Sequence, residues 1–370
     1  MERTIKIENK LSGLEQPVFI IAEAGVNHNG RLALALKLVD VAADAGADAV
    51  KFQTFRAEQV TIASGKMAEY QKRNLGKTES QLAMLKRLEL KEKYYPALIK
   101  RAKERKIIFL SSPHGGFESV DFLKKLKISA FKFGSGDLTN LPLLGYAAKF
   151  KKPMIISTGM GNLQEIKEAV AAIKKAGNNK IAILHCTTNY PTALNKVNLL
   201  AMKTIEKEFG LPVGYSDHTI GIKVSVAAVA LGARIIEKHF TLDKTLTGPD
   251  HKASLDPAEL KELIKQIRIT EKRLASGENS KNLIKELNVQ KALGDGIKKP
   301  VSSELIAAKI GRKSLVARFN IPKETKITGE MLDIKRPGTG IEPKYFKMVI
   351  GKIASKDIAR DALITFKDLK

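Results

Sequence analysis

The sequence has little of what several classes of protein require. Its 370 residues contain one cysteine, Cys186, which excludes an intramolecular disulfide framework and metal clusters of the CxxC type. No apolar run reaches the roughly 18 residues of a membrane-spanning helix. The first ten residues, MERTIKIENK, lack the apolar core of a signal peptide. We therefore expect a cytoplasmic protein from a reducing compartment, without membrane association.

Acidic residues are scarce relative to basic ones, because 39 Asp and Glu stand against 64 Lys and Arg and leave a formal net charge of +25. Such an excess of positive charge is common in proteins that bind nucleic acid. These proteins use a basic stripe with interleaved aromatic residues. The lysines are instead dispersed over helix-like segments such as KEKYYPALIKRAKERK. This distribution favours a solvated surface that attracts small anions, and we expect no nucleic-acid partner.

Short apolar runs alternate with amphipathic segments from Val18 onward, and this alternation predicts eight strands with helices between them. The pattern predicts an α/β protein built on a (β/α)₈ TIM barrel. An open doubly wound sheet is the alternative, but it calls for a GxGxxG turn after its first strand, where this chain has EAGVNHNG. The predicted strands lie at 18–22, 48–54, 107–111, 129–134, 153–158, 181–186, 212–216 and 234–239.

The pattern changes after about Ser276 to a polar connector with several Gly and Pro residues, followed by short strand-like runs separated by turns. We divide the chain into a barrel domain at 1–280, a linker at 281–311 and a small β-rich domain at 312–370. A unit as small as the last is only marginally stable alone, so we expect it to dock on another part of the protein. The long polar loop at 56–90 follows the second strand and is typical of a lid.

Polar side chains gather at the carboxyl ends of the predicted strands, where barrels of this kind place their active sites. Buried barrel strands are ordinarily continuous aliphatic runs, so charges at these ends mark a candidate site. All six histidines of the chain also fall at strand ends or in the loops that follow. The polar strand-end residues are Glu23, Lys51, Gln53, Ser111, Ser112, Lys132, Ser135, His185, Thr188, Ser216, His218, Glu237 and His239.

Two histidines form a candidate metal site. His218 follows the seventh strand and His239 ends the eighth, so their imidazoles can converge on one point. Neutral imidazole suits a divalent transition metal, and two protein ligands leave positions open for substrate and water. Asp217 and Glu237 are candidates to fix the tautomers of these rings.

Two lysines, Lys51 and Lys132, project from strands rather than from helix surfaces. Ammonium groups together with several hydroxyl donors suit a phosphate or carboxylate dianion. The alternative is a lysine that forms a Schiff base, which needs a desolvated amine of lowered pKa. Two lysines among hydroxyl groups favour anion binding. The hydroxyl groups are those of Ser112, Ser135, Thr188 and Ser216.

Two carboxylates and the cysteine each allow a functional and a structural interpretation. Glu23 ends the first strand and can exchange protons with a substrate, or it can serve as the salt-bridge partner of Lys51. Asp137 lies near the rim, where it can act on the substrate or cap the helix that follows. Cys186 is adjacent to His185 on a strand, so their side chains point to opposite faces, and we interpret Cys186 as a small buried apolar residue.

Specific motifs follow one another along the barrel. In order they read IAEAGVNHNG, AVKFQT, FKFGSGDLTN, ISTGM, LHCTTNYP, VGYSDHT, EKHFTLDK and GPDHKASLDP, and the tail reads RKSLVARFNIPKETKITGEMLDIKRPGTGI. In these motifs the chain closely resembles the sialic acid synthase family, phosphoenolpyruvate-dependent enzymes that make N-acetylneuraminate and related nonulosonates. The tail resembles the antifreeze-like, or SAF, domain of that family. The resemblance implies a transferase that condenses phosphoenolpyruvate with an N-acylated amino sugar, N-acetylmannosamine in the commonest case, and releases phosphate.

The resemblance also implies roles for individual residues. His218 and His239 would hold a divalent metal, Mn²⁺ or Mg²⁺, which polarises the aldehyde oxygen of the sugar. Glu23 would transfer a proton or activate water, with Asp137 near the reacting centre. Arg336 would reach the N-acyl group from the SAF domain of a partner subunit, which implies a domain-swapped homodimer. Phosphoenolpyruvate would contact Lys51, Ser112, Lys132, Ser135, Thr188 and Ser216, with Lys51 also among the catalytic residues, and the sugar would contact Gln53, Tyr190 and Asp250.

Substrate preference stays open at this point. Thr188 stands where some family members have Asn or Ser, and Asp137 where some have Glu. A second interpretation is a synthase that uses a 2,4-diacetamido-trideoxyhexose to make legionaminate or pseudaminate, which needs an apolar contact where the mannosamine route meets hydroxyls. A third, from another class, is a non-catalytic carbohydrate- or ice-binding protein, which predicts no requirement for metal or for Lys51.

Overall fold

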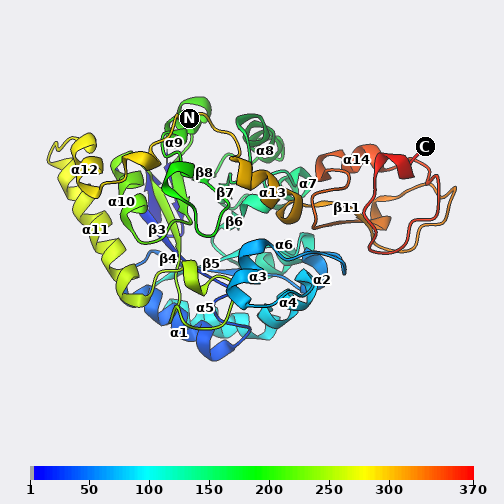
Figure 1. Cartoon of the computed structure of the whole chain (residues 1–370), viewed down its shortest axis with the longest axis horizontal. Coiled ribbons are helices and arrows are strands. Elements are labelled where there is room, and N and C mark those ends of the chain that lie inside the picture. Colours follow the sequence, from blue (N-terminus) through cyan, green and yellow to red (C-terminus); the bar gives the residue numbers. More distant parts are fainter. Residues whose placement is uncertain (1–3) are drawn as a thin grey trace.

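A closed barrel of parallel strands forms the larger part of the computed structural model, which describes residues 4–370 (Figure 1). Consecutive strands pair in parallel, and β10 closes the ring against β3. The eight predicted strands are all present, so the predicted TIM barrel is confirmed. They are β3 (Phe19–Gly25), β4 (Ala49–Thr54), β5 (Ile108–Pro113), β6 (Phe131–Phe133), β7 (Met154–Ser157), β8 (Ile181–Cys186), β9 (Val213–Asp217) and β10 (Ile235–His239).

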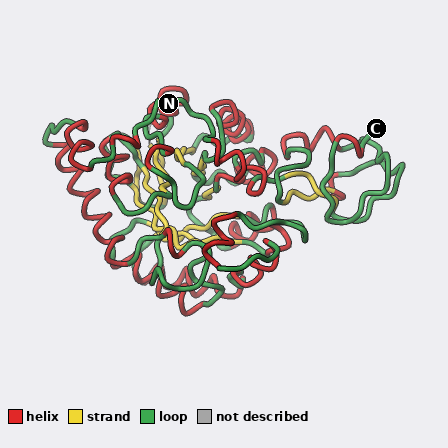
Figure 2. The backbone as a smooth tube through the Cα atoms, viewed as in Figure 1, coloured by secondary structure: helices red, strands yellow, loops and turns green. Residues whose placement is uncertain are grey.

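Helices cover the outside of the barrel, as Figure 2 shows. Each presents an apolar stripe to the strands, as in α8, where Ile166, Ala169, Val170 and Ile173 are buried at spacings of three and four. Asn162 caps this helix with its side chain. The main outer helices are α1 (Leu32–Asp44), α5 (Tyr95–Glu104), α6 (Phe117–Lys125), α7 (Leu141–Ala148), α8 (Leu163–Lys175), α9 (Ala201–Phe209), α10 (Lys223–Ala230) and α11 (Pro257–Ala275).

A short hairpin closes the amino-terminal end of the barrel. Its strands β1 (Thr4–Ile7) and β2 (Lys10–Gly13) pair antiparallel. Ile5 and Ile7 are buried in one cluster with the inward-facing barrel residues, Phe19 among them. Because this end is filled by apolar side chains, the open end of the barrel is the one where the strands finish.

The segment 56–90 folds into three helices at the open end, α2 (Ala57–Val60), α3 (Glu69–Leu75) and α4 (Gln81–Leu88). These helices have a small apolar core of their own, which includes Met67 and Met84. The sequence predicts a lid over this stretch, and the structure places a packed helical cap at the rim.

Two further helices, α12 (Ser280–Leu287) and α13 (Ser302–Gly311), lie in the stretch predicted as a linker. The carboxylate of Glu304 on α13 is buried and accepts hydrogen bonds from the backbone N–H groups of Met160 and Thr188, at 2.7 Å each. α13 is thereby fixed to the loops after β7 and β8, at the open end of the barrel.

The C-terminal unit lies to one side of the barrel (Figure 1). It contains β11 (Ser314–Ala317) paired antiparallel with β12 (Leu332–Lys335), the short helix α14 (Phe346–Val349) and long turns. Its separate apolar core includes Leu315, Ile321 and Ile364. No helix in the described part of the chain is both long and apolar enough to cross a membrane.

Candidate active site

The carboxyl ends of the barrel strands surround a cavity of about 600 Å³. Strand-end side chains form its floor, and its walls come from the segment 56–90, α13 and the C-terminal unit. The predicted site residues line this cavity with one exception, Asp137. Those that line it are Glu23, Lys51, Gln53, Ser112, Lys132, Ser135, Thr188, Tyr190, Ser216, His218, His239, Asp250 and Arg336.

Two lysines and two glutamates form the floor. Lys51 pairs with Glu23 and lies 3.7 Å from Glu237, while the Lys132 Nζ lies 2.9 Å from Glu237 Oε1. All four side chains are almost completely buried. Glu237 therefore lies between the lysines and accepts a hydrogen bond from Ser216, rather than orienting a histidine as predicted. Buried side chains can stay ionised when each is paired with an opposite charge in this way.

The two glutamates of the floor have pKa values displaced in opposite directions. Burial raises the pKa of Glu23 to about 7, and the attraction of Lys51 only partly offsets this. Burial also opposes ionisation of Glu237, but the ammonium groups of Lys132 and Lys51 outweigh it and hold the pKa of Glu237 at about 2. Two carboxyl groups with pKa values this far apart can play different parts in proton transfer.

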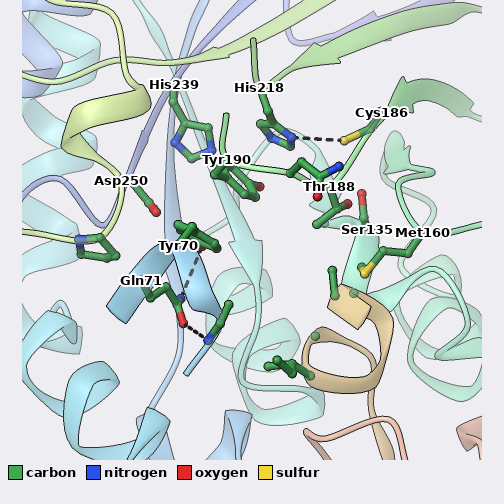
Figure 3. A pocket seen from close by; sticks show the side chains of 18 of the residues that line it. Tyr70, Gln71, Ser135, Met160, Cys186, Thr188, Tyr190, His218, His239 and Asp250 are labelled. Atoms are coloured by element: carbon green, nitrogen blue, oxygen red, sulfur yellow. Dashed lines mark hydrogen bonds between the residues drawn. The ribbon is translucent and has the colours of Figure 1, made fainter. Parts of the chain in front are cut away.

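His218, His239 and Tyr190 lie together on one side of the cavity, as Figure 3 shows. The imidazole centroids are 5.7 Å apart. His218 Nδ1 is 2.8 Å from the carbonyl of Thr187, which can only accept, so Nδ1 carries the proton and Nε2 keeps its lone pair. His239 Nδ1 is buried and has no hydrogen-bond partner among the described residues. Cys186 Sγ lies 3.7 Å from His218 Nδ1. The interpretation of Cys186 as a small buried apolar residue does not account for this polar contact.

This pair of imidazoles fits a divalent metal. Each ring offers a nitrogen without a protein partner. Burial lowers the pKa of His239 well below its usual value, which keeps that ring neutral as a ligand must be. Burial also opposes protonation of His218, but Cys186 and the carbonyl of Thr187 outweigh it and raise the pKa of that ring, so metal binding at His218 would compete with a proton. Residues 4–370 contain no group of three or more His, Cys, Asp or Glu side chains that could hold a metal. Substrate or water would have to complete the coordination.

Glycine is required beside this site at Gly25, which has φ +52°. A Cβ there would lie 3.2 Å from both Glu23 Oε1 and His239 Cε1. The backbone therefore approaches the carboxylate and the imidazole more closely than another residue would allow.

Some strand-end residues point outward, because side chains alternate along a strand. His185 Nε2 lies 2.8 Å from the carbonyl of Val197, on the outer face of the barrel. Asp217 pairs with Lys238 at 2.8 Å and is likewise turned away from the cavity. The prediction that Asp217 fixes the tautomer of His218 is therefore wrong.

Asp137 also lies outside the cavity wall. It follows β6 in a short 3₁₀ turn, and its carboxylate is 2.9 Å from the Nζ of Lys313 in the C-terminal unit. No side chain caps α7, so Asp137 does not cap that helix either. The catalytic role expected of Asp137 stays a prediction, and the structure shows its side chain paired with an ammonium group from a distant part of the sequence, outside the lining of the cavity.

Arg336 lines the cavity of its own chain. Its backbone N–H donates to Val60 and its carbonyl accepts from Ile62, which joins the end of β12 to the loop after α2. The expectation that Arg336 comes from a partner subunit stays a prediction, because the structure describes one chain and no partner subunit. The domain-swapped homodimer stays a prediction.

Several wall residues have no individual role predicted from the sequence. Tyr70 stacks on Tyr190 with ring centroids 4.9 Å apart, and both line the cavity. Figure 3 shows Met160 on the side of the cavity opposite Asp250. His114 was one of six histidines near the rim, without an assigned role, and Ile306 lay in the predicted linker. Their convergence depends on loops that no local pattern places.

Comparison with known proteins agrees with this geometry. The model of the NeuB family matches residues 38–279, and that of the SAF domain matches residues 312–370. The chain is 50% identical to the N,N'-diacetyllegionaminic acid synthase of Campylobacter jejuni subsp. jejuni, over 93% of this chain and 98% of that protein. It is 36% identical to the N-acetylneuraminate-9-phosphate synthase of Homo sapiens, over 95% and 92%.

A solved structure supports the whole fold. The spore coat polysaccharide biosynthesis protein spsE of Bacillus subtilis matches with a TM-score of 0.84 and 35% identity, over 99% of both chains. The predicted C-terminal SAF domain is confirmed. The resemblance to the sialic acid synthase family and the prediction of a phosphoenolpyruvate-condensing transferase are confirmed as well. The chain belongs to the NeuB family of sugar-acid synthases.

Proposed function

We propose that the chain condenses phosphoenolpyruvate with a 2,4-diacetamido-trideoxyhexose to give N,N'-diacetyllegionaminic acid and phosphate. The observation that carries this proposal is the 50% identity to a synthase of that name, against 36% to a synthase of N-acetylneuraminate 9-phosphate. N-acetylmannosamine, the acceptor that the sequence motifs imply in the commonest case, is the second candidate, with N-acetylneuraminate as its product.

An apolar wall of the cavity supports the trideoxy sugar. Ile306, Ala307 and Ile310 on α13 line the cavity, as does Met160 after β7. Ile306 is 64% exposed although it belongs to the wall, so a bound ligand can bury it. Such a sugar carries one methyl group where N-acetylmannosamine has a hydroxymethyl group, and a second acetamido group. Its methyl groups gain from an apolar contact, whereas a hydroxyl would lose its hydrogen bonds to water there.

The lysines of the floor are proposed to bind phosphoenolpyruvate. Lys51 and Lys132 both lie close to Glu237. The Lys51 Nζ donates to the hydroxyl group of Ser112, and the hydroxyl group of Ser216 donates to Glu237. Burial lowers the pKa of Lys132, but the carboxylates beside it favour its charged form, as they do for Lys51. Two paired ammonium groups support anion binding over a Schiff base. Ser135 and Thr188 complete the proposed anion site.

The reaction forms a bond between the methylene carbon of phosphoenolpyruvate and the aldehyde carbon of the sugar. Water then adds to the cationic carbon, and phosphate leaves with cleavage of its C–O bond. Glu23 is proposed to exchange the proton with water or with the aldehyde oxygen. A divalent ion, Mn²⁺ or Mg²⁺, held by His218 and His239 would supply Lewis-acid polarisation of that oxygen.

The sugar is proposed to contact the remaining predicted residues. Gln53 lies at the end of β4, Tyr190 and Asp250 lie on the side of the two histidines, and Arg336 comes from the SAF domain. Assembly as a homodimer and a cytoplasmic location stay predictions from the sequence.

Phosphate release by the purified protein tests the proposal. With Mn²⁺ and phosphoenolpyruvate, we expect release that depends on a 2,4-diacetamido-trideoxyhexose and disappears with EDTA. A higher kcat/KM with N-acetylmannosamine would replace the first candidate by the second. Absence of release with every sugar, from protein shown to be folded, would contradict both.

A further inference from the structure

A buried charged cluster joins the SAF domain to the barrel directly beside the cavity. Lys313 precedes β11, Asp137 follows β6, and His114 follows β5. The side chains of Lys313 and Asp137 are 1% and 2% exposed. The Lys313 Nζ donates to the backbone carbonyl of His114 at 2.9 Å and pairs with Asp137 Oδ1 at 2.9 Å. One ammonium group therefore fixes both the carboxylate and the loop that carries the histidine.

The carboxylate of Asp137 presents its second oxygen to the histidine. Oδ1 pairs with the Lys313 Nζ at 2.9 Å and accepts a hydrogen bond from the side-chain amide of Asn140 at 3.2 Å. Oδ2 lies 3.6 Å from His114 Nδ1, which has no hydrogen-bond partner among the described residues. A proton on Nδ1 is attracted by this oxygen, whereas a lone pair there would be repelled. The arrangement therefore favours the tautomer with its proton on Nδ1 and its lone pair on Nε2.

The ring of His114 belongs to the cavity wall. Its Nε2 makes no hydrogen bond to residues 4–370, and the ring packs against Gly134, where a Cβ would lie 3.0 Å from His114 Cε1. Burial lowers the pKa of His114 to about 4, and the nearby Arg336 and Lys313 act in the same direction against the attraction of Asp137. The imidazole is thus neutral near pH 7 and offers an acceptor to the cavity.

We propose that Lys313, acting through Asp137, sets the tautomer and orientation of His114, and that His114 Nε2 accepts a hydrogen bond from an N–H or O–H group of the acceptor sugar. Lys313 and Asp137 are positioning residues, because neither lines the cavity. The sugar contact rests on the proposed function, but the tautomer does not. The SAF domain then shapes the site through Lys313 as well as through Arg336.

NMR of the imidazole nitrogens in the full chain tests the tautomer. The ¹⁵N signals of His114 are assigned by their loss in His114→Gln. We expect a protonated Nδ1 and an unprotonated Nε2 at pH 7 in the wild type, and a mixture of tautomers in Lys313→Met and in Asp137→Asn. A protonated Nε2 in the wild type, or a signal unaffected by both variants, would overturn the proposal.

Arg312→Met is the matched control. Arg312 also joins the SAF domain to the barrel, through Glu165 at 2.6 Å and the carbonyl of Met160, and it makes no contact with His114. We expect this variant to lose thermal stability as Lys313→Met does, while its His114 signals stay those of the wild type. If Arg312→Met changes the tautomer equally, general loosening of the domain explains the effect and the proposal fails.

Addition of sugar tests the second half of the proposal. With inorganic phosphate present in place of phosphoenolpyruvate, we expect a 2,4-diacetamido-trideoxyhexose to shift the Nε2 signal of His114. In kinetics, His114→Phe should raise the KM for the sugar about tenfold, the effect of one lost hydrogen bond, and leave the KM for phosphoenolpyruvate within about twofold. Equal changes in both KM values, or no Nε2 shift with any sugar, contradict the contact. Absence of turnover with the predicted tautomer present would contradict the proposed function alone.

Discussion

The floor and the walls of the cavity differ in where their residues come from and in how they are held. The floor consists of charged groups on barrel strands, such as Lys132 and Glu237, whose buried ion pairs fix their positions. The walls come from segments outside the strands, such as Ile306 on α13 and Arg336 in the SAF domain. Groups on rigid strands suit the bond-forming steps, while the appended segments can vary with the sugar. We infer that the floor governs chemistry and the walls govern selection.

The largest effect is expected from the floor. Lys132→Met removes one proposed ligand of phosphoenolpyruvate and leaves Glu237 with a single ammonium partner. We expect kcat/KM for phosphoenolpyruvate to fall about 10³-fold, because a fixed cation opposite the anion is lost. Steady-state phosphate release measures this, and circular dichroism checks the fold. A loss below tenfold would contradict the proposal that Lys132 binds phosphoenolpyruvate.

Glu23→Gln comes next, because it keeps the size of the side chain and removes its capacity to exchange a proton. We expect kcat to fall about 10²-fold, as for loss of a general acid or base. The KM for the sugar should change little, and single-turnover measurements would locate the loss in the chemical step. Full turnover in this variant would assign Glu23 a structural role as partner of Lys51.

A smaller effect is expected from the walls. Ile306→Ser removes an apolar contact, and we expect the ratio of kcat/KM for a 2,4-diacetamido-trideoxyhexose over N-acetylmannosamine to fall about tenfold. Leu305→Ser is the matched control, since Leu305 is 57% exposed on the same helix and does not line the cavity. If the two variants change the ratio equally, α13 does not select the sugar.

The last expected effect is on stability rather than on activity, and it concerns pH and the wall residue His114. Burial lowers the pKa of His114 to about 4, so the unfolded chain, with an ordinary value near 6.5, binds more protons at pH 5. Its contribution to stability is complete above about pH 6.5 and is lost as the pH falls toward 4, roughly 2 kcal/mol at pH 5. His114→Gln should therefore lose less stability between pH 7.5 and 5 than the wild type, as measured by urea unfolding. An unchanged pH dependence would place the pKa of His114 near its ordinary value.

The sequence predicted the floor well. Each floor residue lies on a strand that its apolar run made visible, and the parallel strands of a barrel all finish at the same end. Glu23, Lys51, Lys132 and Glu237 therefore had to lie near one rim once eight strands were recognised. The direction in which a single strand residue points does not follow from the presence of the strand alone, because it also depends on the register of that strand. Asp217 is the example, since it points away from the cavity and pairs with Lys238.

The walls could not be predicted in the same way. The hairpin β1–β2, the three helices in 56–90 and α13 are short, and their places depend on contacts with distant residues. Asp137 illustrates this, since a lysine 176 positions later in the sequence withdraws it from the cavity. The sequence by itself therefore determined the barrel, its chemistry-bearing rim and the family, through periodicity and strand-end residues. Only the tertiary structure decided which side chains face the cavity, because long-range packing and ion pairs choose among locally equivalent arrangements.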